Sequence, residues 1–216
     1  MTKALILQPV NPNYPDEMKE LASSLLSRLP KIDNGIELQI EQDDIALDIP
    51  PHKSMYAKHA AVRNYMIDTY LKPEHDFVVW IDADLMAYPI DICSKLIQAN
   101  PRGLAAPLVV MEHHRDKFFD IAGFIEHNGM RSDNNEPWFK TPIIDGVIDL
   151  DSVGTLYSVP ASLYKEGARY SPPYIDYYVE HWSLCREARL RGLKVVAVPS
   201  ITIVHTWLPD YGLEIH

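Results

Sequence analysis

Short apolar runs alternate along this chain with segments whose apolar residues have helical spacing, and this alternation limits the fold more than any other feature. The runs at residues 4–7 and 77–81 are too short for helices and are typical of buried strands. Between them, apolar residues after Asp16 recur every three or four positions, as on one face of a helix. Strands that alternate with helices over short connections predict an α/β domain with a mostly parallel central sheet flanked by helices.

The same patterns place the other elements. We expect strands at residues 3–9, 36–40, 77–81, 104–110, 154–159, 194–198 and 201–204, and helices from residue 16, over 56–70, after Pro89 and over 179–191. Residues 111–150 are irregular and polar, and long irregular regions in compact domains are often binding loops. The 216 residues fit one domain.

The chain is acidic, with 30 Asp and Glu residues against 20 Lys and Arg residues and a formal net charge of −10. This charge argues against general binding to nucleic acid or to an anionic membrane. An acidic protein that binds an anionic ligand usually needs a local cation, which makes a metal site plausible.

Other features of the sequence concern the compartment. Cys93 and Cys185 are the only cysteines, and we expect both to be buried and free, because two such distant cysteines form neither a disulfide scaffold nor a zinc cluster. We find no signal-peptide core and no apolar run of about 20 residues that would span a membrane. We therefore expect a cytoplasmic protein without a membrane span.

Two aspartates follow the strongest predicted strand. Asp82 and Asp84 are one residue apart, so both carboxylates point to one side if the chain stays extended. Such a pair repels unless a cation neutralises it, and Mg²⁺ or Mn²⁺ prefers these oxygen ligands together with phosphates and water. Two solvated aspartates in a turn would share this spacing. The buried strand before the pair and the helix predicted after Pro89 favour a site for a nucleotide diphosphate.

In α/β sheets, ligands bind beyond the carboxyl ends of the strands. Asn11 and His205 also follow predicted strands, as the two aspartates do. We therefore expect these side chains at one edge of the sheet.

Several motifs resemble those of known enzymes. Trp80-Ile81-Asp82-Ala83-Asp84, followed by Tyr88-Pro89, resembles the donor-binding strand of GT-A glycosyltransferases, and residues 57–64 resemble their Lys/Arg-bearing helix. Residues 153–157 and 180–204 are more similar to the Anp1-type mannosyltransferase group, and the whole pattern also resembles family 2-like glycosyltransferases. The resemblance extends over residues 55–207 and depends on the order of the motifs.

The resemblance implies a single GT-A-like (Rossmann-like) domain over residues 1–216, in which residues 1–110 bind the nucleotide sugar and residues 111–216 bind the acceptor. It implies a metal-dependent glycosyltransferase that moves a sugar from a nucleotide-diphosphate sugar to an acceptor hydroxyl. The Anp1-like motifs favour GDP-mannose as donor. The acceptor stays open among a glycan, a lipid, a protein and a modified nucleobase, as do the stereochemistry and the oligomeric state.

The resemblance also implies roles for single residues at the metal. Asp84 would bind Mn²⁺ or Mg²⁺ directly, and Asp82 would contact the donor ribose or a metal-bound water. His205 would complete the metal site from the last strand. A histidine that is satisfied by a backbone partner at a strand end is the alternative for His205.

Glu180 would face the acceptor hydroxyl, as a general base in an inverting enzyme or as an orienting group in a retaining one. The familiar Glu-Asp or Asp-Asp pattern is Glu180-His181 here, which weakens the assignment of a base. Arg63 would bind phosphate, Asn11 the base or ribose, and Gly154 would let the backbone approach the sugar. A solvated cation, a turn residue and a strand bulge are the respective alternatives.

Other classes of protein fit less well. A sugar-phosphate nucleotidyltransferase would have a glycine-rich, basic loop after the first strand, and residues 8–13 contain neither glycine nor a basic residue. A phosphatase that uses an Asp-x-Asp nucleophile would place that pair early in the chain. A non-catalytic module that binds carbohydrate or a nucleotide sugar with the same fold stays as the alternative function.

Overall fold

We describe a computed structural model of the chain, which defines residues 1–45, 55–130, 132–133, 135, 137–172 and 179–206. Its elements, in chain order, are β1 (Thr2–Val10), α1 (Asp16–Ser27), β2 (Ile32–Asp33), β3 (Ile36–Asp44), α2 (Met55–Tyr70), β4 (Phe77–Ile81), β5 (Leu85–Ala87), α3 (Ile92–Ala99), β6 (Leu104–Met111), a 3₁₀ turn (His127–Gly129), β7 (Ile148–Asp149), β8 (Leu156–Pro160), α4 (Ala161–Lys165), α5 (Glu180–Leu190) and β9 (Val195–His205).

The strands form one sheet in the order β2-β3-β1-β4-β8-β6-β9-β5, with β7 paired to β9. The pairs β1–β3, β1–β4 and β6–β9 are parallel, as the sequence predicts. However, β8 lies antiparallel between β4 and β6, so the sheet is mixed and the expectation of a mostly parallel sheet needs this correction. The physical reason is that no crossover helix precedes β8, which returns from the irregular region 111–150.

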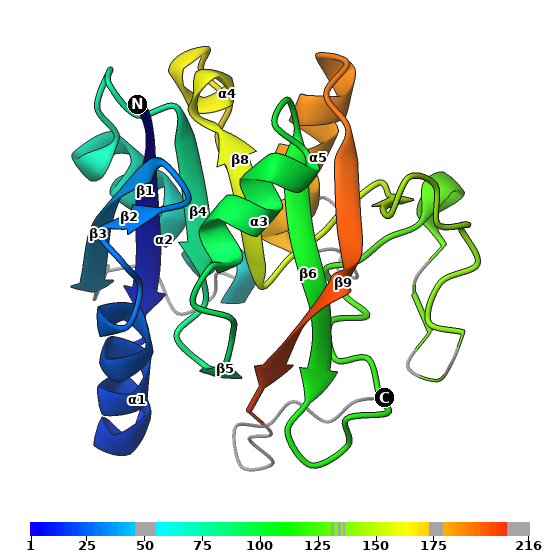
Figure 1. Cartoon of the computed structure of the whole chain (residues 1–216), viewed down its shortest axis with the longest axis horizontal. Coiled ribbons are helices and arrows are strands. Elements are labelled where there is room, and N and C mark those ends of the chain that lie inside the picture. Colours follow the sequence, from blue (N-terminus) through cyan, green and yellow to red (C-terminus); the bar gives the residue numbers. More distant parts are fainter. Residues whose placement is uncertain (46–54, 131, 134, 136, 173–178, 207–216) are drawn as a thin grey trace.

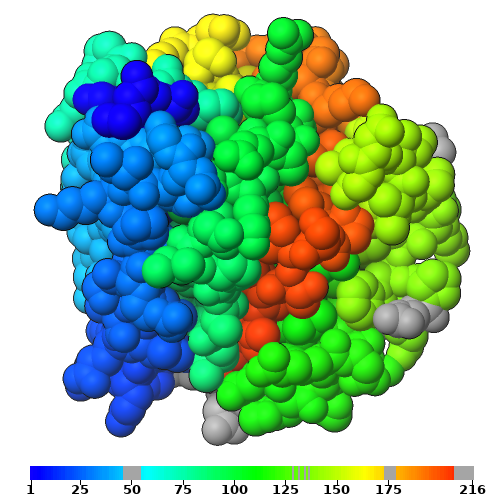
Figure 2. Space-filling model, in the orientation of Figure 1, coloured from blue at the N-terminus to red at the C-terminus, as the bar shows by residue number. Residues whose placement is uncertain are grey.

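Figure 1 shows the arrowheads of β1, β6 and β9 pointing to the same edge of the sheet and β8 pointing the other way. Helix α3 crosses the face toward the viewer and packs on β6 and β8, whereas α2 and α5 lie on the far face and contact each other. The space-filling view has the N-terminal elements on the left and the irregular region after β6 at the bottom and right (Figure 2). The α/β fold class is thus confirmed.

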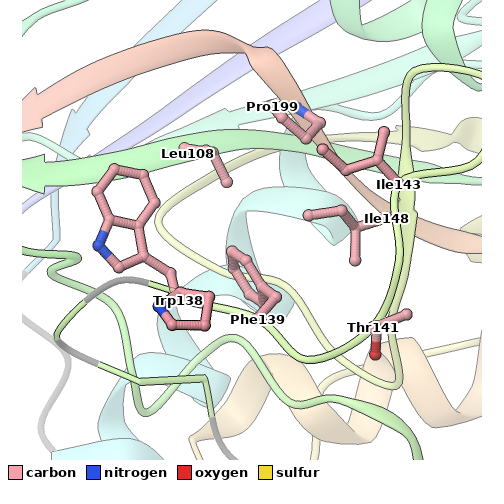
Figure 3. A pocket seen from close by; sticks show the side chains of 8 residues that line it. Leu108, Trp138, Phe139, Thr141, Ile143, Ile148 and Pro199 are labelled. Atoms are coloured by element: carbon pink, nitrogen blue, oxygen red, sulfur yellow. The ribbon is translucent and has the colours of Figure 1, made fainter.

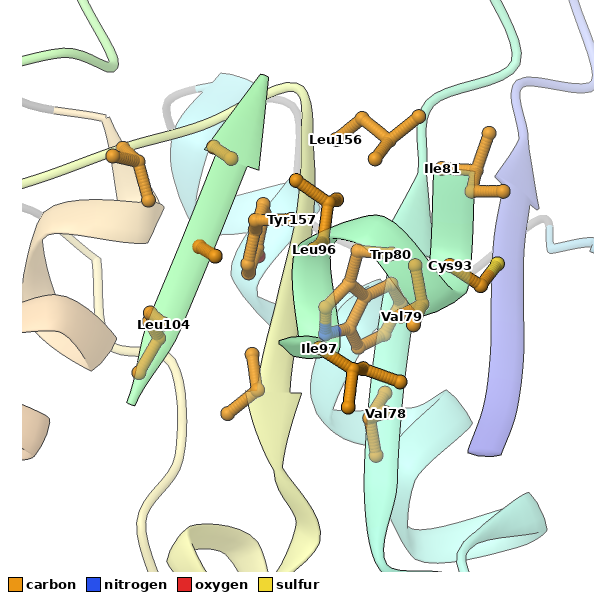
Figure 4. Close-up of a cluster of buried hydrophobic side chains, with 14 of the residues drawn as sticks. Val78, Val79, Trp80, Ile81, Cys93, Leu96, Ile97, Leu104, Leu156 and Tyr157 are labelled. Carbon is orange, nitrogen blue, oxygen red and sulfur yellow. The ribbon is translucent and has the colours of Figure 1, made fainter. Parts of the chain in front are cut away.

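The core consists of the apolar runs from which the strands were predicted. Residues 4–7 of β1 and 78–81 of β4 are fully buried, and every residue of β6 is also buried. Their side chains pack with those of α3 (Figure 4), where Leu96 and Ile97 face Trp80 and its neighbours. Cys93 and Cys185 are buried free thiols, as expected. Within the described part of the chain, no helix is long and apolar enough to span a membrane.

Two predicted strands, 194–198 and 201–204, form the single strand β9, whose register against β6 shifts beyond Pro107. The extra residues between Val198 and Thr202 include Pro199, which lacks the N–H that a regular ladder would use. This irregularity lets β9 continue to His205 at the edge where β1 and β4 also end.

Candidate active site

The two aspartates lie at the end of β4, as predicted. The Asp82 backbone N–H donates to the Thr155 carbonyl oxygen at 3.2 Å, which extends the pairing of β4 with β8 by one residue. The side chains of Asp82 and Asp84 are 24% and 19% exposed, so both are mostly shielded from water. They therefore need partners of opposite charge.

Arg63 of α2 is the partner of Asp82. Its Nη2 atom donates to Asp82 Oδ1 at 2.8 Å, and its Nε atom donates to Glu180 Oε1 at 3.1 Å. Arg63 is itself buried, and its guanidinium lies over three aromatic rings, which favour a cation over their faces. The distances from Arg63 Cζ to the ring centroids are 4.9 Å for Trp80, 5.9 Å for Tyr157 and 5.8 Å for Tyr170.

The pKa values of the two carboxylates that Arg63 contacts, Asp82 and Glu180, shift in opposite directions. Burial raises the pKa of Asp82, although the Arg63 charge opposes this rise. Burial also acts to raise the pKa of Glu180, but His181, Arg63 and His59 outweigh it and hold that pKa at about 2. A buried carboxylate that is so firmly ionised is far from the pKa near the working pH that suits a general base. The hydrogen bond from Arg63 Nε to Glu180 Oε1 also fixes the position of this carboxylate.

Asp84 pairs with His205, from the other end of the chain. The His205 Nε2 atom lies 3.1 Å from Asp84 Oδ1, and the Tyr14 hydroxyl donates to Asp84 Oδ2 at 3.0 Å. The His205 ring stacks on Phe119, with centroids 3.7 Å apart and planes 14° apart. Burial would lower the pKa of His205, but the Asp84 charge raises it to about 9. Burial would raise the pKa of Asp84, and His205 lowers it to about 2.

The donor atoms of this pair fit a divalent cation. His205 Nδ1 lies 2.7 Å from the Thr206 carbonyl oxygen, to which it donates, so Nε2 is the nitrogen that faces Asp84. Asp84 Oδ1 is buried and makes no hydrogen bond beyond this ion-pair contact. Neighbouring ligand atoms around a Mg²⁺ ion with bonds of about 2.1 Å lie about 3 Å apart, which matches the Nε2–Oδ1 separation.

Among the described residues, no group of three or more His, Cys, Asp or Glu side chains is arranged to hold a metal ion. Mg²⁺ and Mn²⁺ commonly take only one or two protein ligands and complete their shells with phosphate and water. Asp84 and His205 would be the protein ligands of such an ion, which would take the place of the proton on His205 Nε2.

Gly154 lies where two side chains approach the backbone closely. A Cβ atom at Gly154 would lie 2.6 Å from Asp120 Oδ2 and 2.8 Å from His181 Cδ2. The next residue, Thr155, has φ = 61°, an unusual value for a β-branched residue, and its hydroxyl donates to Asp120 Oδ2 at 2.6 Å. Burial raises the pKa of Asp120, against the hydrogen bonds from Thr155 and Gly123.

Asn11 is exposed, and its side-chain oxygen accepts the Asn13 N–H at 3.0 Å, which is the geometry of a turn. From the same loop, Tyr14 rather than Asn11 contacts Asp84. The structure thus joins Arg63, Asp82 and Glu180 into one connected group, places Gly154 beside Asp120 and His181, joins Asp84 to His205, and leaves Asn11 outside these contacts.

The contacts of Tyr14, Asp120, Thr155 and His181 are not predicted from the sequence. Tyr14 and Asp120 belong to irregular segments, where no periodicity indicates which side chains turn inward. The backbone strain at Thr155 has no signature in the sequence. His181 was noted only as a departure from a pattern.

A separate hollow of about 530 Å³ lies away from these residues, between the region 137–143 and strands β6, β7 and β9 (Figure 3). Its lining is mainly apolar and includes Leu108, Trp138, Phe139 and Ile148. None of the predicted site residues lines it.

Comparison with known proteins bears on the family and the fold. The family model described as Anp1 matches residues 52–141, which contain Arg63, Asp82 and Asp84. The catalytic domain of Drosophila β1,4-galactosyltransferase 7, solved with xylobiose, has a TM-score of 0.55 at 15% identity, over 94% of this chain and 68% of its own length. GalNAc-T7, solved with UDP, GalNAc and Mn²⁺, has a TM-score of 0.59 at 10% identity, over 97% of this chain and 44% of its own length.

The S. aureus TarS 1-349 structure has a TM-score of 0.53 at 12% identity, over 95% of this chain and 60% of its own length. At these identities, the likeness shows the fold. A comparison with curated protein sequences finds no match. The chain thus has the fold of these glycosyltransferases, the GT-A fold, and is similar over residues 52–141 to the Anp1 family.

Proposed function

We propose that this chain is a metal-dependent glycosyltransferase that moves a sugar from a nucleotide-diphosphate sugar to an acceptor hydroxyl. The observation that carries the proposal is the contact of Asp84 and His205. Asp84 directly precedes β5, which pairs with β9 in the register Leu85–His205, and this pairing brings a carboxylate oxygen within 3.1 Å of an imidazole nitrogen at the edge where β4 and β9 end.

Asp84 and His205 would hold Mn²⁺ or Mg²⁺, and the bound ion would supply positive charge beside the diphosphate leaving group. Asp82, held by Arg63 at 2.8 Å, would accept a hydrogen bond from the donor ribose or from a metal-bound water. We assign residues 1–110, with Asn11 at the base or ribose, to the donor. Residues 111–216 would then bind the acceptor.

Arg63 and Glu180 would act by position. Two carboxylates already occupy Nε and Nη2 of Arg63, which leaves Nη1 as the part of the guanidinium without a hydrogen-bond partner among the described residues. Because Nη1 is also buried, Arg63 would position Asp82 and Glu180, and a phosphate would not meet the bidentate fork that the sequence suggested. Glu180 would orient Arg63 and the acceptor side of the site.

The donor is the finer part of the proposal. The Anp1 family match supports GDP-mannose, whereas the solved structure of GalNAc-T7 contains UDP. A panel of UDP-sugars and GDP-sugars with Mn²⁺ should therefore be screened by thermal shift, because a bound donor raises the apparent stability. A selective shift with GDP-mannose is the expected result. A selective shift with a UDP-sugar would show that this UDP-sugar, and not GDP-mannose, is the donor.

The metal assignment can be tested by titrating Mn²⁺ against donor binding in single variants. Asp84→Asn and His205→Ala should each raise the Mn²⁺ concentration that half-saturates donor binding, by about tenfold or more. His127→Ala is the matched control, because His127 Nδ1 also pairs with an aspartate, Asp151, at 3.0 Å, but outside this site. Titration curves of His205→Ala that overlap those of the wild type would remove the metal role of His205.

A further inference from the structure

A line of buried hydrogen bonds runs from the core of β4 to the start of α5. The Trp80 Nε1–H group donates to the Tyr164 hydroxyl at 2.9 Å, and the Tyr164 and Tyr170 hydroxyl oxygens are 2.7 Å apart. The Tyr170 and Tyr157 hydroxyl oxygens are also 2.7 Å apart, and the Tyr157 oxygen lies 3.2 Å from His181 Nδ1. All five side chains are buried, so water does not substitute for these contacts.

The direction of this line follows from counting protons. The indole N–H can only donate, so the Tyr164 oxygen accepts from it. If each hydroxyl then donates to the next group, the three tyrosine protons fill the three remaining contacts and the last one reaches His181 Nδ1. If His181 Nδ1 donated instead, the line would reverse, and the Tyr164 proton would have no acceptor among the described residues. A buried hydroxyl proton without an acceptor costs free energy, so the first direction is favoured.

His181 Nδ1 is therefore an acceptor, and the ring carries its proton on Nε2. That nitrogen lies 3.6 Å from Glu180 Oε1, the same oxygen that accepts the Arg63 Nε–H. A proton on Nε2 is attracted to this carboxylate, whereas a lone pair there would be repelled. The contact with Glu180 thus supports the same tautomer independently of the tyrosines.

We propose that His181 is a positioning residue with one fixed tautomer, set by the Trp80–Tyr164–Tyr170–Tyr157 line, and that its Nε2–H group keeps Glu180, Arg63 and Asp82 aligned for the donor. The part of this statement that concerns the donor rests on the proposed function. The tautomer itself does not.

The arrangement also leaves His181 without the ability to take a proton from an acceptor. Its Nδ1 lone pair already receives the Tyr157 hydroxyl proton, and its Nε2 atom already carries a proton. Burial lowers the pKa of His181 to about 4, against the Glu180 charge, which agrees with a neutral ring. His181 stands where the related glycosyltransferase pattern has a second acidic residue, so in this chain that position holds a hydrogen-bond donor.

The tautomer can be measured directly on the full chain by two-dimensional NMR of the ¹⁵N-labelled histidine rings. The His181 signals are assigned by their absence from the spectrum of His181→Gln. We expect, at neutral pH, a protonated Nε2 and an Nδ1 with the shift of an acceptor nitrogen. A protonated Nδ1, or two protonated nitrogens, would overturn the inference, whether or not the protein transfers a sugar.

Two variants then test the positioning role. Tyr157→Phe removes the donor to His181 Nδ1 and should weaken Mn²⁺-dependent nucleoside diphosphate binding by about tenfold, the effect of losing one buried hydrogen bond. Tyr70→Phe is the matched control, because it removes a tyrosine hydroxyl that donates to Asp43 Oδ2 at 2.7 Å, outside this line of hydrogen bonds.

For Tyr70→Phe we expect binding within about twofold of the wild type and an unchanged His181 spectrum. Equal losses in both variants, or unaltered binding in folded Tyr157→Phe, would show that His181 does not position the site. If the wild type itself binds no nucleoside diphosphate, the proposed function fails and the tautomer measurement still decides the first part of the inference.

Discussion

Arg63 joins two carboxylates that come from distant parts of the chain, Asp82 at the end of β4 and Glu180 at the start of α5. All three side chains are mostly or fully shielded from water, so each charge depends on the others for its stability. The protonation of Glu180 should therefore be visible in the stability of the whole protein.

The pKa of Glu180 is lowered from 4.5 to about 2, with burial opposing the shift and His181 and Arg63 producing it. A lowered folded-state pKa stabilises the folded protein above pH 4.5, and this contribution is lost as the pH falls toward 2. It amounts to about 3 kcal/mol. In Glu180→Gln, the free energy of unfolding should therefore fall less steeply between pH 4.5 and 2, as measured by urea denaturation. Equal slopes in variant and wild type would contradict the shift.

Gly154 offers a second test at this scale. An added methyl group would meet Asp120 at 2.6 Å and His181 at 2.8 Å, so Gly154→Ala should displace both side chains. We expect a loss of stability of about 1–3 kcal/mol and a loss of donor affinity of tenfold or more. Gly103→Ala is the control, because its methyl group would clash with the Lys194 carbonyl oxygen, away from the site.

Gly103→Ala should lower the stability and leave the donor affinity of the folded protein unchanged. Calorimetric titration of a nucleoside diphosphate with Mn²⁺ compares the two variants. Unchanged affinity in Gly154→Ala would mean that the space beside Gly154 is not used by the donor.

At the scale of elements, the segment after β6 supports the end of β9. Phe119 stacks on His205 at 3.7 Å and limits the rotation of its ring. Phe119→Leu should therefore lower the affinity for Mn²⁺ several-fold while the fold persists, in line with the effects of groups that orient metal ligands. Phe139→Leu is a suitable control, because Phe139 packs on Phe118 and Phe124 instead. Equal Mn²⁺ titrations of both variants would contradict the role of the stacking.

The elements that the sequence predicts are those with a complete signal of their own. The fully apolar residues 77–81 coincide with β4, and the helical spacing over 56–70 coincides with α2 to within one residue. Strands β5 and β7, of three and two residues, are too short to carry a pattern and exist because they pair with β9. The direction of β8 likewise depends on its two neighbours in the sheet.

Some residues of the candidate site could likewise be predicted from the sequence and others could not. Asp82, Asp84 and His205 could be predicted because each follows a strand, and the sheet brings strand ends together. The pairing of Arg63 with Glu180 could not be predicted, because it depends on the packing of α2 against α5. Asp120 and Tyr14 reach the site from irregular segments, whose paths are set by tertiary contacts.

At the scale of the whole molecule, charge sets the requirement for a cation. The chain has a formal net charge of −10, and the carboxylates of Asp82, Asp84, Asp120 and Glu180 lie at or beside the candidate site. The Arg63 cation is already shared by two of these acids. A nucleotide diphosphate would therefore meet net repulsion unless a divalent cation accompanies it.

Donor binding should therefore depend on a divalent cation, and one calorimetric experiment tests this dependence most directly. A nucleoside diphosphate, GDP or UDP, is titrated into the EDTA-treated protein and into the same protein with saturating Mn²⁺. The account predicts that Mn²⁺ tightens the binding of the nucleoside diphosphate at least about tenfold. This corresponds to a change of about 1.4 kcal/mol or more in the free energy of binding. Equal affinity in both titrations would contradict it.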